Sequence, residues 1–427
     1  MFPADAPKEQ LVNFWLQQPR ELQTAVVAVL AALLAGQVNR GIYRLAWSPR
    51  QIGPWSAPVA DAPARRWYDR LPIVGWIGLA RETPFHGKGY WLRPIVVELG
   101  LALGLAWLYW SIVHHRVDGL LALGIPVEQT IALLLFLRLA TLLLPLTIAT
   151  FIDLDEKTIP DEVTVPGTLA GLLWSWLVPG SALPVIAATQ QTPLLATSPG
   201  KWAPQLDSAT GLLVGLACVG CWCWALLPKT WTTRHGWWRA FRYLWASSLR
   251  TPWFWRYGLI GCGASAIVVV AWLQGHERWQ GLLTALLGMA FGGGLVWTVR
   301  IVAGGVLQKE AMGFGDVTLM AMIGAFLGWQ PSLIVFFMAP FAALFVALVQ
   351  WILTRNREIA FGPYLSVAAL WLIVRWDAIW EQAGGSFALG WRIPLIIGFC
   401  FVAMAAMLWT WRAIEGAWHR TAEPENS

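Results

Sequence analysis

Long apolar runs, separated by shorter polar or charged loops, cover most of the chain. A helix needs about 20 mostly apolar residues to cross a bilayer, and most of these runs reach or approach that length. Lipid offers no hydrogen bonds to the backbone, so such runs are stable there as helices. The pattern predicts an all-α polytopic membrane protein with about 9–11 transmembrane helices and a small cytoplasmic N-terminal subdomain. The predicted segments are 22–38, 94–113, 128–151, 163–180, 209–227, 256–273, 280–304, 317–328, 332–353, 361–376 and 393–411.

Segment 317–328 is short for a full crossing, so it either extends backward through Gly313 or is re-entrant. Basic residues distinguish these alternatives, because cytoplasmic loops carry an excess of Lys and Arg. Without a crossing at 317–328, the arginines that follow it would lie on the outer side. These are Arg355, Arg357, Arg412 and Arg420. The charge pattern therefore favours a crossing.

Composition supports the membrane interpretation and changes the meaning of the net charge. Hydrophobic residues make up 57% of the chain and charged residues 13%, whereas soluble domains carry about 25% charged residues. The net charge of +6 comes from basic loops on the predicted inner side, so it indicates orientation rather than nucleic-acid binding. Many of the 31 tryptophans fall at segment ends, as expected for a membrane–water interface.

Loop lengths and charge predict how the chain is divided. The outer loop 181–208 is rich in Thr, Pro, Ser and Gln and is expected to be flexible. The stretch 229–256 is basic and aromatic, which is typical of a segment lying on anionic lipid. The predicted regions are 1–39 (N-terminus and first transmembrane helix), 40–93 (cytoplasmic subdomain), 94–376 (transmembrane core with an insertion at about 229–280) and 377–427 (additional helix and cytoplasmic tail).

Acidic residues beside membrane segments are costly and are therefore functional candidates. One cluster, Asp153-Leu-Asp155-Glu-Lys-Thr-Ile-Pro160-Asp161, begins where segment 128–151 ends. Another, Gly313-Phe-Gly315-Asp316, opens segment 317–328. The predicted topology places both on the inner face.

Two carboxylates at one membrane depth suit peptide hydrolysis by an aspartic pair. Close carboxylates cannot both be ionised, so one acts as base toward water and the other as acid toward the substrate. Simpler interpretations remain open. The first cluster is also typical of a polar loop between helices, and Asp316 could serve only as a helix cap.

Together the clusters resemble the type IV prepilin peptidases, also called leader peptidases. That family pairs an Asp-x6-Pro-Asp stretch with a later GxGD motif, matched here by Asp153 to Asp161 and by Gly313 to Asp316. Further segments that look like the family are Asn39–Leu45, Asp69–Trp76, Arg93–Glu98, Gly324–Gln330 and Arg357–Pro363.

The resemblance implies an aspartic endopeptidase that cuts the leader of a prepilin or type II secretion pseudopilin at the cytoplasmic face of the bacterial inner membrane. By position, Asp153 and Asp316 take the catalytic roles. The supporting residues are Gly313, Gly315, Asp155, Asp161 and Pro160.

Cofactor expectations follow from where this chain departs from the family. Many members carry two CxxC pairs in the N-terminal region, which look like a zinc site. Here the first cysteine is Cys218, and all five lie in apolar segments, so no zinc is predicted. S-adenosylmethionine is implied only if N-methylation of the cleaved product is retained, and the altered N-terminal region weakens that expectation.

Two other functions fit parts of the pattern. A presenilin-like protease also carries GxGD, but its partner motif is Tyr-Asp inside a helix, whereas Ile152-Asp153 stands at a predicted helix end. A transporter or non-catalytic assembly factor would use buried charges such as Glu98 and Arg138 to line a pathway. For Arg138, in the middle of segment 128–151, a structural ion pair is expected instead.

Overall fold

The computed structural model describes most of the chain. The predicted basic-aromatic stretch 229–256 and the segment Arg357–Pro363 lie largely outside the described residues. Those residues are 6–50, 52–59, 61–115, 128–187, 190–227, 242, 246, 250, 252–307, 312–353, 361–390 and 392–422.

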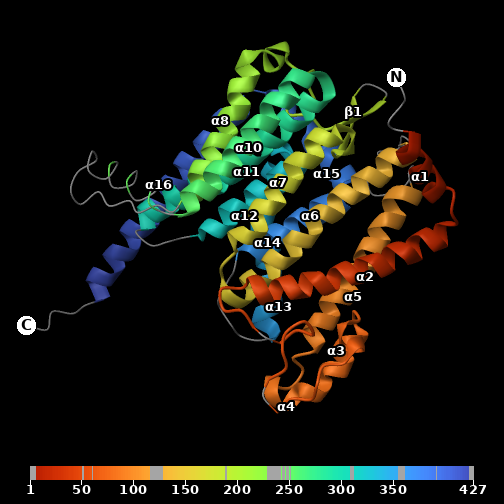
Figure 1. Ribbon diagram of the computed structural model, residues 1–427. Helices are drawn as coiled ribbons and strands as arrows, with labels where there is room; N and C mark the ends of the chain where they lie inside the picture. The colour runs from red at the N-terminus through yellow and green to blue at the C-terminus, as the bar shows by residue number, and fades with distance from the viewer. Residues whose placement is uncertain are drawn as a thin grey trace, which may run out of the picture.

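The described residues are almost entirely helical, which confirms the predicted fold class (Figure 1). By length and composition, seven helices could cross a membrane, and three shorter apolar helices lie among them. The long helices are α2 (Arg20–Leu45), α5 with its π-helical extension (Leu92–His114), α6 (Gln129–Glu156), α8 (Ala209–Leu226), α10 (Pro252–Gln274), α11 (His276–Leu307) and α16 (Arg392–Ala422). The shorter ones are α12 (Phe314–Leu327), the Trp329–Phe345 part of α13 (Trp329–Leu353) and α14 (Gly362–Val374).

Helix α12 lies at the centre of the bundle. It contacts α6, α7 (Asp161–Leu177), α11, α13 and α14, and every residue from Asp316 to Leu327 is buried. Small residues permit this packing, because a Cβ added to Gly324 would lie 2.0 Å from the carbonyl oxygen of Gly288 on α11. Close backbone approach at small residues is a common way for helices to associate in lipid.

The ends of α12 show that it runs from one end of the bundle to the other. It begins beside the C-terminal end of α6. Directly after it ends, Trp329 Nε1 donates to the carbonyl of Ala196 at 2.7 Å, in the predicted outer loop. Fourteen residues span only about 21 Å, so α12 is shorter than a full crossing. Its direction nevertheless agrees with the crossing that the charge pattern predicts.

The loop 181–208, expected to be flexible, contains ordered structure. Strands β1 (Pro184–Ala187) and β2 (Gln190–Pro193) pair antiparallel. Leu183, Val185 and Leu194 are buried. These apolar residues are scattered among polar ones, so composition alone hides how they pack over the ends of the helices.

The N-terminal segments form a separate structure at the opposite end of the bundle. Short helices α3 (Val74–Leu79) and α4 (Thr83–His86) lie in a compact region after α2 (Figure 1). Buried Glu98 on α5 accepts hydrogen bonds from Asn39 on α2 and Trp76 on α3, each at 2.9 Å. The subdomain is thereby tied to two bundle helices.

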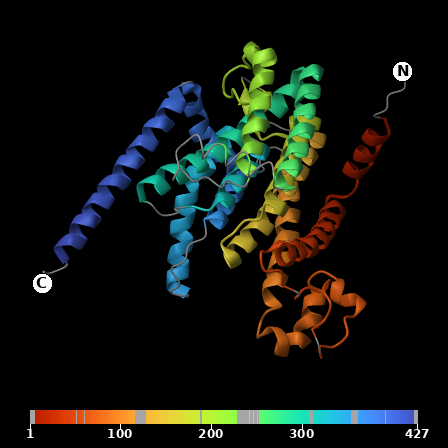
Figure 2. The ribbon, with the colours of Figure 1, turned by 60° about the vertical axis from the view of Figure 1, so that its left-hand side comes forward.

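Two helices lie at the margins of the molecule. Helix α16 runs along one edge of the bundle (Figure 2), and only 6% of its apolar window is buried within the protein. Helix α1 (Ala6–Leu16) precedes α2 and was not predicted, because its apolar residues are too few for a membrane segment. Helix α15 (Trp376–Ala383) joins α14 to the chain that leads into α16.

Candidate active site

Asp153 lies in the last turn of α6, where the helix leaves the bundle. Its side chain is buried, with 4% of the residue exposed. The helix ends at Lys157, which adopts a left-handed conformation with φ of 55° and donates its N–H to the carbonyl of Asp153. The following residues turn back at once into α7. The C-terminal end of a long helix therefore fixes the first carboxylate.

Asp316 lies in the first turn of α12 and is also buried, with 6% exposed. Gly313 occupies the N-cap position of this helix. Gly313 lies beside the carboxylate of Asp316, since a Cβ added to it would be 3.7 Å from Asp316 Oδ2. Asp316 is thus not the cap residue itself. The positive end of the α12 dipole lies at this carboxylate.

The two carboxylates share one small region although 163 positions separate them (316 minus 153). They lie close enough for the charge on Asp153 to act directly on Asp316. A third helix end meets them, since the backbone N–H of Gly362, at the start of α14, donates to Asp153 Oδ2 at 3.0 Å. The ends of α6, α12 and α14 converge here.

Ile159 fills the space between these helix ends. A Cβ on Gly315 would lie 2.7 Å from Ile159 Cβ, and one on Gly362 would lie 2.6 Å from Asp153 Oδ2 and 2.8 Å from Ile159 Cδ1. Real Cβ atoms essentially never approach so closely. Glycine is therefore required sterically at 315 and 362, whereas a Cβ on Gly313 would meet nothing nearer than 3.7 Å.

The other predicted site residues have separate partners. Asp155 pairs with Arg93 at 2.6 Å and, more distantly, with Arg50 at 3.9 Å. Asp161 accepts a hydrogen bond from the Tyr257 hydroxyl at 3.3 Å, and Pro160 is the N-cap of α7. These residues border the site. The pair that the structure brings together is Asp153 with Asp316.

Sequence reasoning missed two contributors to this region. Gly362 donates to Asp153, and its only signal was the Phe361-Gly362-Pro363 segment quoted for the resemblance. Ile159 lies inside the first acidic cluster, but nothing in its identity indicated that two distant glycines pack against it.

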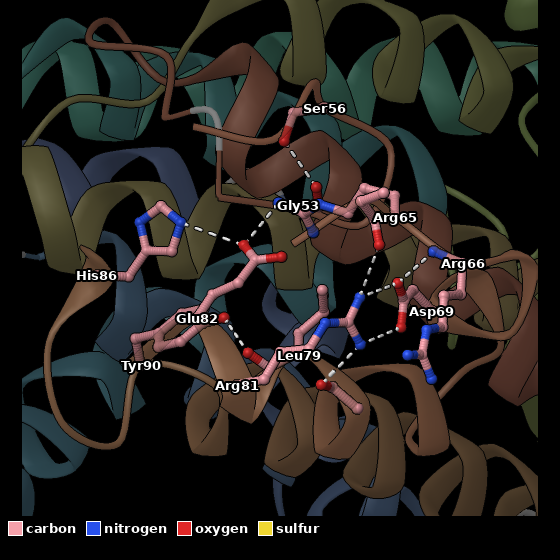
Figure 3. Close-up of polar contacts among 12 residues, drawn as sticks. Gly53, Ser56, Arg65, Arg66, Asp69, Leu79, Arg81, Glu82, His86 and Tyr90 are labelled. Atoms are coloured by element: carbon pink, nitrogen blue, oxygen red, sulfur yellow. Dashed lines mark hydrogen bonds and ion pairs between the residues drawn. The ribbon is translucent and has the colours of Figure 1, made fainter. Parts of the chain in front are cut away.

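The N-terminal subdomain does not offer a zinc site of the kind the resemblance implies. In the part of the chain that the structure describes, no group of three or more His, Cys, Asp or Glu side chains gathers to hold a metal. The buried acids of the subdomain face cations instead (Figure 3): Glu82 pairs with Arg65 at 3.0 Å, and Asp69 pairs with Arg81. The side chains of the subdomain therefore do not fit a zinc site. That the protein binds no zinc in solution stays a prediction.

Comparison with known proteins confirms the resemblance over part of the chain. Residues 251–348 match the type IV leader peptidase family. Similar proteins are three prepilin leader peptidase/N-methyltransferases. That of Aeromonas hydrophila is 37% identical over 117 residues, which cover 23% of this chain and 38% of the relative. That of Pseudomonas aeruginosa is 39% identical over 102 residues (22% of this chain, 32% of the relative), and that of Escherichia coli is 34% identical over 88 residues (20% of this chain, 39% of the relative). The chain thus spans less than two-fifths of the length of these relatives. No solved structure matches. The family match contains Asp316 but not Asp153.

Proposed function

We propose that this protein is a membrane-embedded aspartic endopeptidase, because residues 251–348 match the type IV leader peptidase family. Its substrate is the leader of a type IV prepilin or a type II secretion pseudopilin. Cleavage takes place at the cytoplasmic face of the bacterial inner membrane, with Asp153 and Asp316 as the catalytic pair.

One observation carries this proposal: Asp153 and Asp316 are both buried in the region where the ends of α6, α12 and α14 converge, close enough for the charge of one to act on the other. Within the described residues, no Lys or Arg is seen in a salt bridge with either carboxylate, although the charge of Arg300 acts on Asp316. The backbone N–H of Gly362 donates to Asp153, and the backbone of Gly313 lies beside Asp316. Buried acids held for structure alone are usually paired with a cation.

This arrangement supports hydrolysis by shared-proton chemistry. The pair holds one proton between two carboxyl groups, since like charges so close cannot both persist. The ionised carboxylate removes a proton from water as the water oxygen attacks the peptide carbonyl carbon, and the other carboxyl group gives its proton to the carbonyl oxygen. Collapse of the tetrahedral intermediate breaks the C–N bond, and the leaving nitrogen takes the proton that came from water. The pair titrates as a unit.

Orientation supports a cytoplasmic site. The catalytic end of the bundle is the end that carries the subdomain and most of the basic loops, which the positive-inside rule assigns to the cytoplasm. A basic leader would be repelled by these loops at long range, so docking relies on shorter-range contacts. Methyl transfer is a separate activity named in the relatives, and the mass of the cleaved product would reveal it.

Leader cleavage in cells tests the proposal. The protein and a candidate prepilin from the same genome would be expressed in a host lacking its own leader peptidase, and prepilin size followed on gels. Asp153→Asn and Asp316→Asn should each reduce the rate at least about a thousandfold, because each removes one half of the acid–base pair. Glu162→Gln, which removes an exposed carboxylate at the same end of the bundle, is the matched control.

Two results would contradict the proposal. The first is cleavage that survives either asparagine substitution. The second is absence of cleavage by the membrane-inserted wild type with several prepilins, which would favour a non-catalytic assembly factor or a transporter.

A further inference from the structure

Arg138 is a buried cation in the middle of membrane helix α6, and its partners are neutral. Only 4% of the residue is exposed. Its Nε donates to the carbonyl of Phe326 at 3.1 Å, while Nη2 donates to the same carbonyl and to Ser175 Oγ, the latter at 2.9 Å. The sequence predicted an ion pair for Arg138. That prediction is wrong for the described part of the chain, where no acidic side chain contacts this guanidinium. Its charge must therefore be balanced in another way.

The C-terminal end of α12 supplies that balance. The last carbonyls of a helix have no partner within the helix and carry partial negative charge. Gly328 closes the end of α12 with φ of 94° and donates its N–H to Gly324. Arg138 donates twice to Phe326, one residue before the end of the helix. A guanidinium presents several donors in a fixed planar fork, which suits such a contact.

The contact joins the two helices that carry the proposed catalytic pair. Arg138 and Asp153 both lie on α6, whereas Phe326 and Asp316 both lie on α12. The helices are antiparallel, so they are linked at two levels: by the carboxylates at one end and by the Arg138–Phe326 contact deeper in the bundle. Sliding or rotation of α12 would break the second link.

We propose that Arg138 is a positioning residue that caps the buried C-terminal end of α12 and so holds Asp316 in place against Asp153, a role that rests on the proposed cleavage activity. Arg138 does not touch the reacting atoms. It acts through the α12 backbone, with Ser175 of α7 orienting the guanidinium.

A bound anion is the competing explanation for a buried cation. Arg138 also lines a small cavity with Ser175, Thr284 and Gly328. The partial negative charge of the α12 end disfavours an anion there, because like charges repel. The helix cap therefore accounts for Nε and Nη2, whereas Nη1 is buried without a hydrogen-bond partner in the described residues.

The test compares Arg138→Lys, which keeps the charge, with Arg138→Met, which keeps the length but removes charge and donors. Ser175→Ala is the control that removes a guanidinium partner outside α12. In full-length protein, Arg138→Met should lower kcat for leader cleavage about ten- to thirtyfold with little change in KM, as expected for loss of a favourable charge at a helix end. Arg138→Lys should recover most of that loss, and Ser175→Ala should cost less than about threefold.

Hydrogen–deuterium exchange of 314–327 provides a readout that does not depend on cleavage. Arg138→Met should speed exchange in the last turn of α12 about tenfold while leaving α5 unchanged. Unchanged exchange in 314–327, or a methionine variant as active as the lysine variant, would overturn the cap. If the methionine variant does not accumulate, kcat and the exchange rate of 314–327 are measured on Arg138→Lys instead. Both should then lie between the wild-type values and those expected for Arg138→Met. Values equal to those of the wild type would overturn the cap. If the wild type cleaves no prepilin, the proposed function fails, and exchange still decides the cap.

Discussion

The N-terminal subdomain and the centre of the bundle bury acidic side chains in opposite ways. In the subdomain, Asp69 and Glu82 are fully buried and each faces an arginine (Figure 3). In the bundle, Asp153 and Asp316 are nearly as buried but lie close enough to interact electrostatically, and Asp153 accepts a hydrogen bond from the Gly362 N–H. A buried acid in an ion pair is neutralised and holds structure, whereas two neighbouring acids that form no salt bridge can share and exchange a proton. The groups around a carboxylate, more than its burial, therefore distinguish an acid that stabilises the fold from an acid suited to proton transfer.

Outside the two carboxylates themselves, the largest effect is expected from closing the space around them. Gly362→Ala and Gly315→Ala should each reduce leader cleavage about a hundredfold or more, since their Cβ atoms would collide with Asp153 Oδ2 or Ile159 and a small displacement of reacting groups is costly. Gly313→Ala should have a much smaller effect. Gly294→Ala, whose Cβ meets nothing within 4 Å, is the control. Initial rates of prepilin cleavage at equal membrane levels are the measurement, and equal rates for Gly313→Ala and Gly315→Ala would show that sterics do not govern the motif.

In the subdomain, removing an acid should cost stability rather than chemistry. Glu82→Gln leaves Arg65, whose side chain is only 9% exposed, without its ionic partner, which should cost about 3 kcal/mol of folding free energy. Cleavage by protein that remains folded should stay within about threefold of the wild type, because the site itself is untouched. Thermal unfolding followed by tryptophan fluorescence measures the loss, with exposed Glu277→Gln as control. Loss of activity at unchanged thermal stability would instead place Glu82 in the functional machinery.

Acid should affect the subdomain through Asp69. Burial alone would raise the pKa of Asp69, but hydrogen bonds from Arg81 and the Arg66 backbone, with the charge of Arg81, lower it below its ordinary value. A lowered pKa in the folded state stabilises the protein above the unfolded pKa of about 3.9, and this stabilisation is lost as pH falls through the folded value. Melting temperature between pH 3 and 7 should therefore fall less steeply on acidification in Asp69→Asn than in the wild type. Exposed Asp61→Asn should follow the wild-type curve; the same curve for Asp69→Asn would argue against the ion pair.

The smallest effect is expected where the two regions meet. Asp155 pairs with Arg93 at a partly exposed position, and such pairs contribute about 1 kcal/mol or less and weaken with salt. Asp155→Asn should lower thermal stability slightly at low salt, negligibly at high salt, and leave cleavage within about threefold. A loss comparable to that of Asp316→Asn would move Asp155 into the catalytic group.

The helices were predictable from the sequence because each must bury about 20 apolar residues in lipid, which leaves a long, local signal. Predicted segment 128–151 became α6, and 317–328 became α12, with ends shifted by only a few residues. Hairpin β1–β2 left no comparable signal, since its stability comes from contacts with helix ends far away in the chain.

The candidate site was predictable from the sequence only at residues whose side chains are chemically distinctive. Carboxylates at helix ends indicated Asp153 and Asp316, but Gly362 lies 209 residues from Asp153 and no local pattern joins them. Partners can also be misjudged when charge is the only guide. An acidic partner was expected for Arg138, and the structure supplies a backbone carbonyl, which every residue has and no sequence pattern reveals.

The burial of α12 from Asp316 to Leu327 has a consequence for how the protein meets its surroundings. Helices α5, α13 and α16 present bulky apolar side chains outward, such as Leu103, Phe341 and Val402, and these are the surfaces that acyl chains would touch. From Asp316 to Leu327, α12 presents none. Changes in bilayer thickness or fluidity act first on the outer helices and reach α12 only through their packing. The helix that carries Asp316 is thus insulated from lipid composition, which would allow one catalytic geometry to persist in membranes of different make-up.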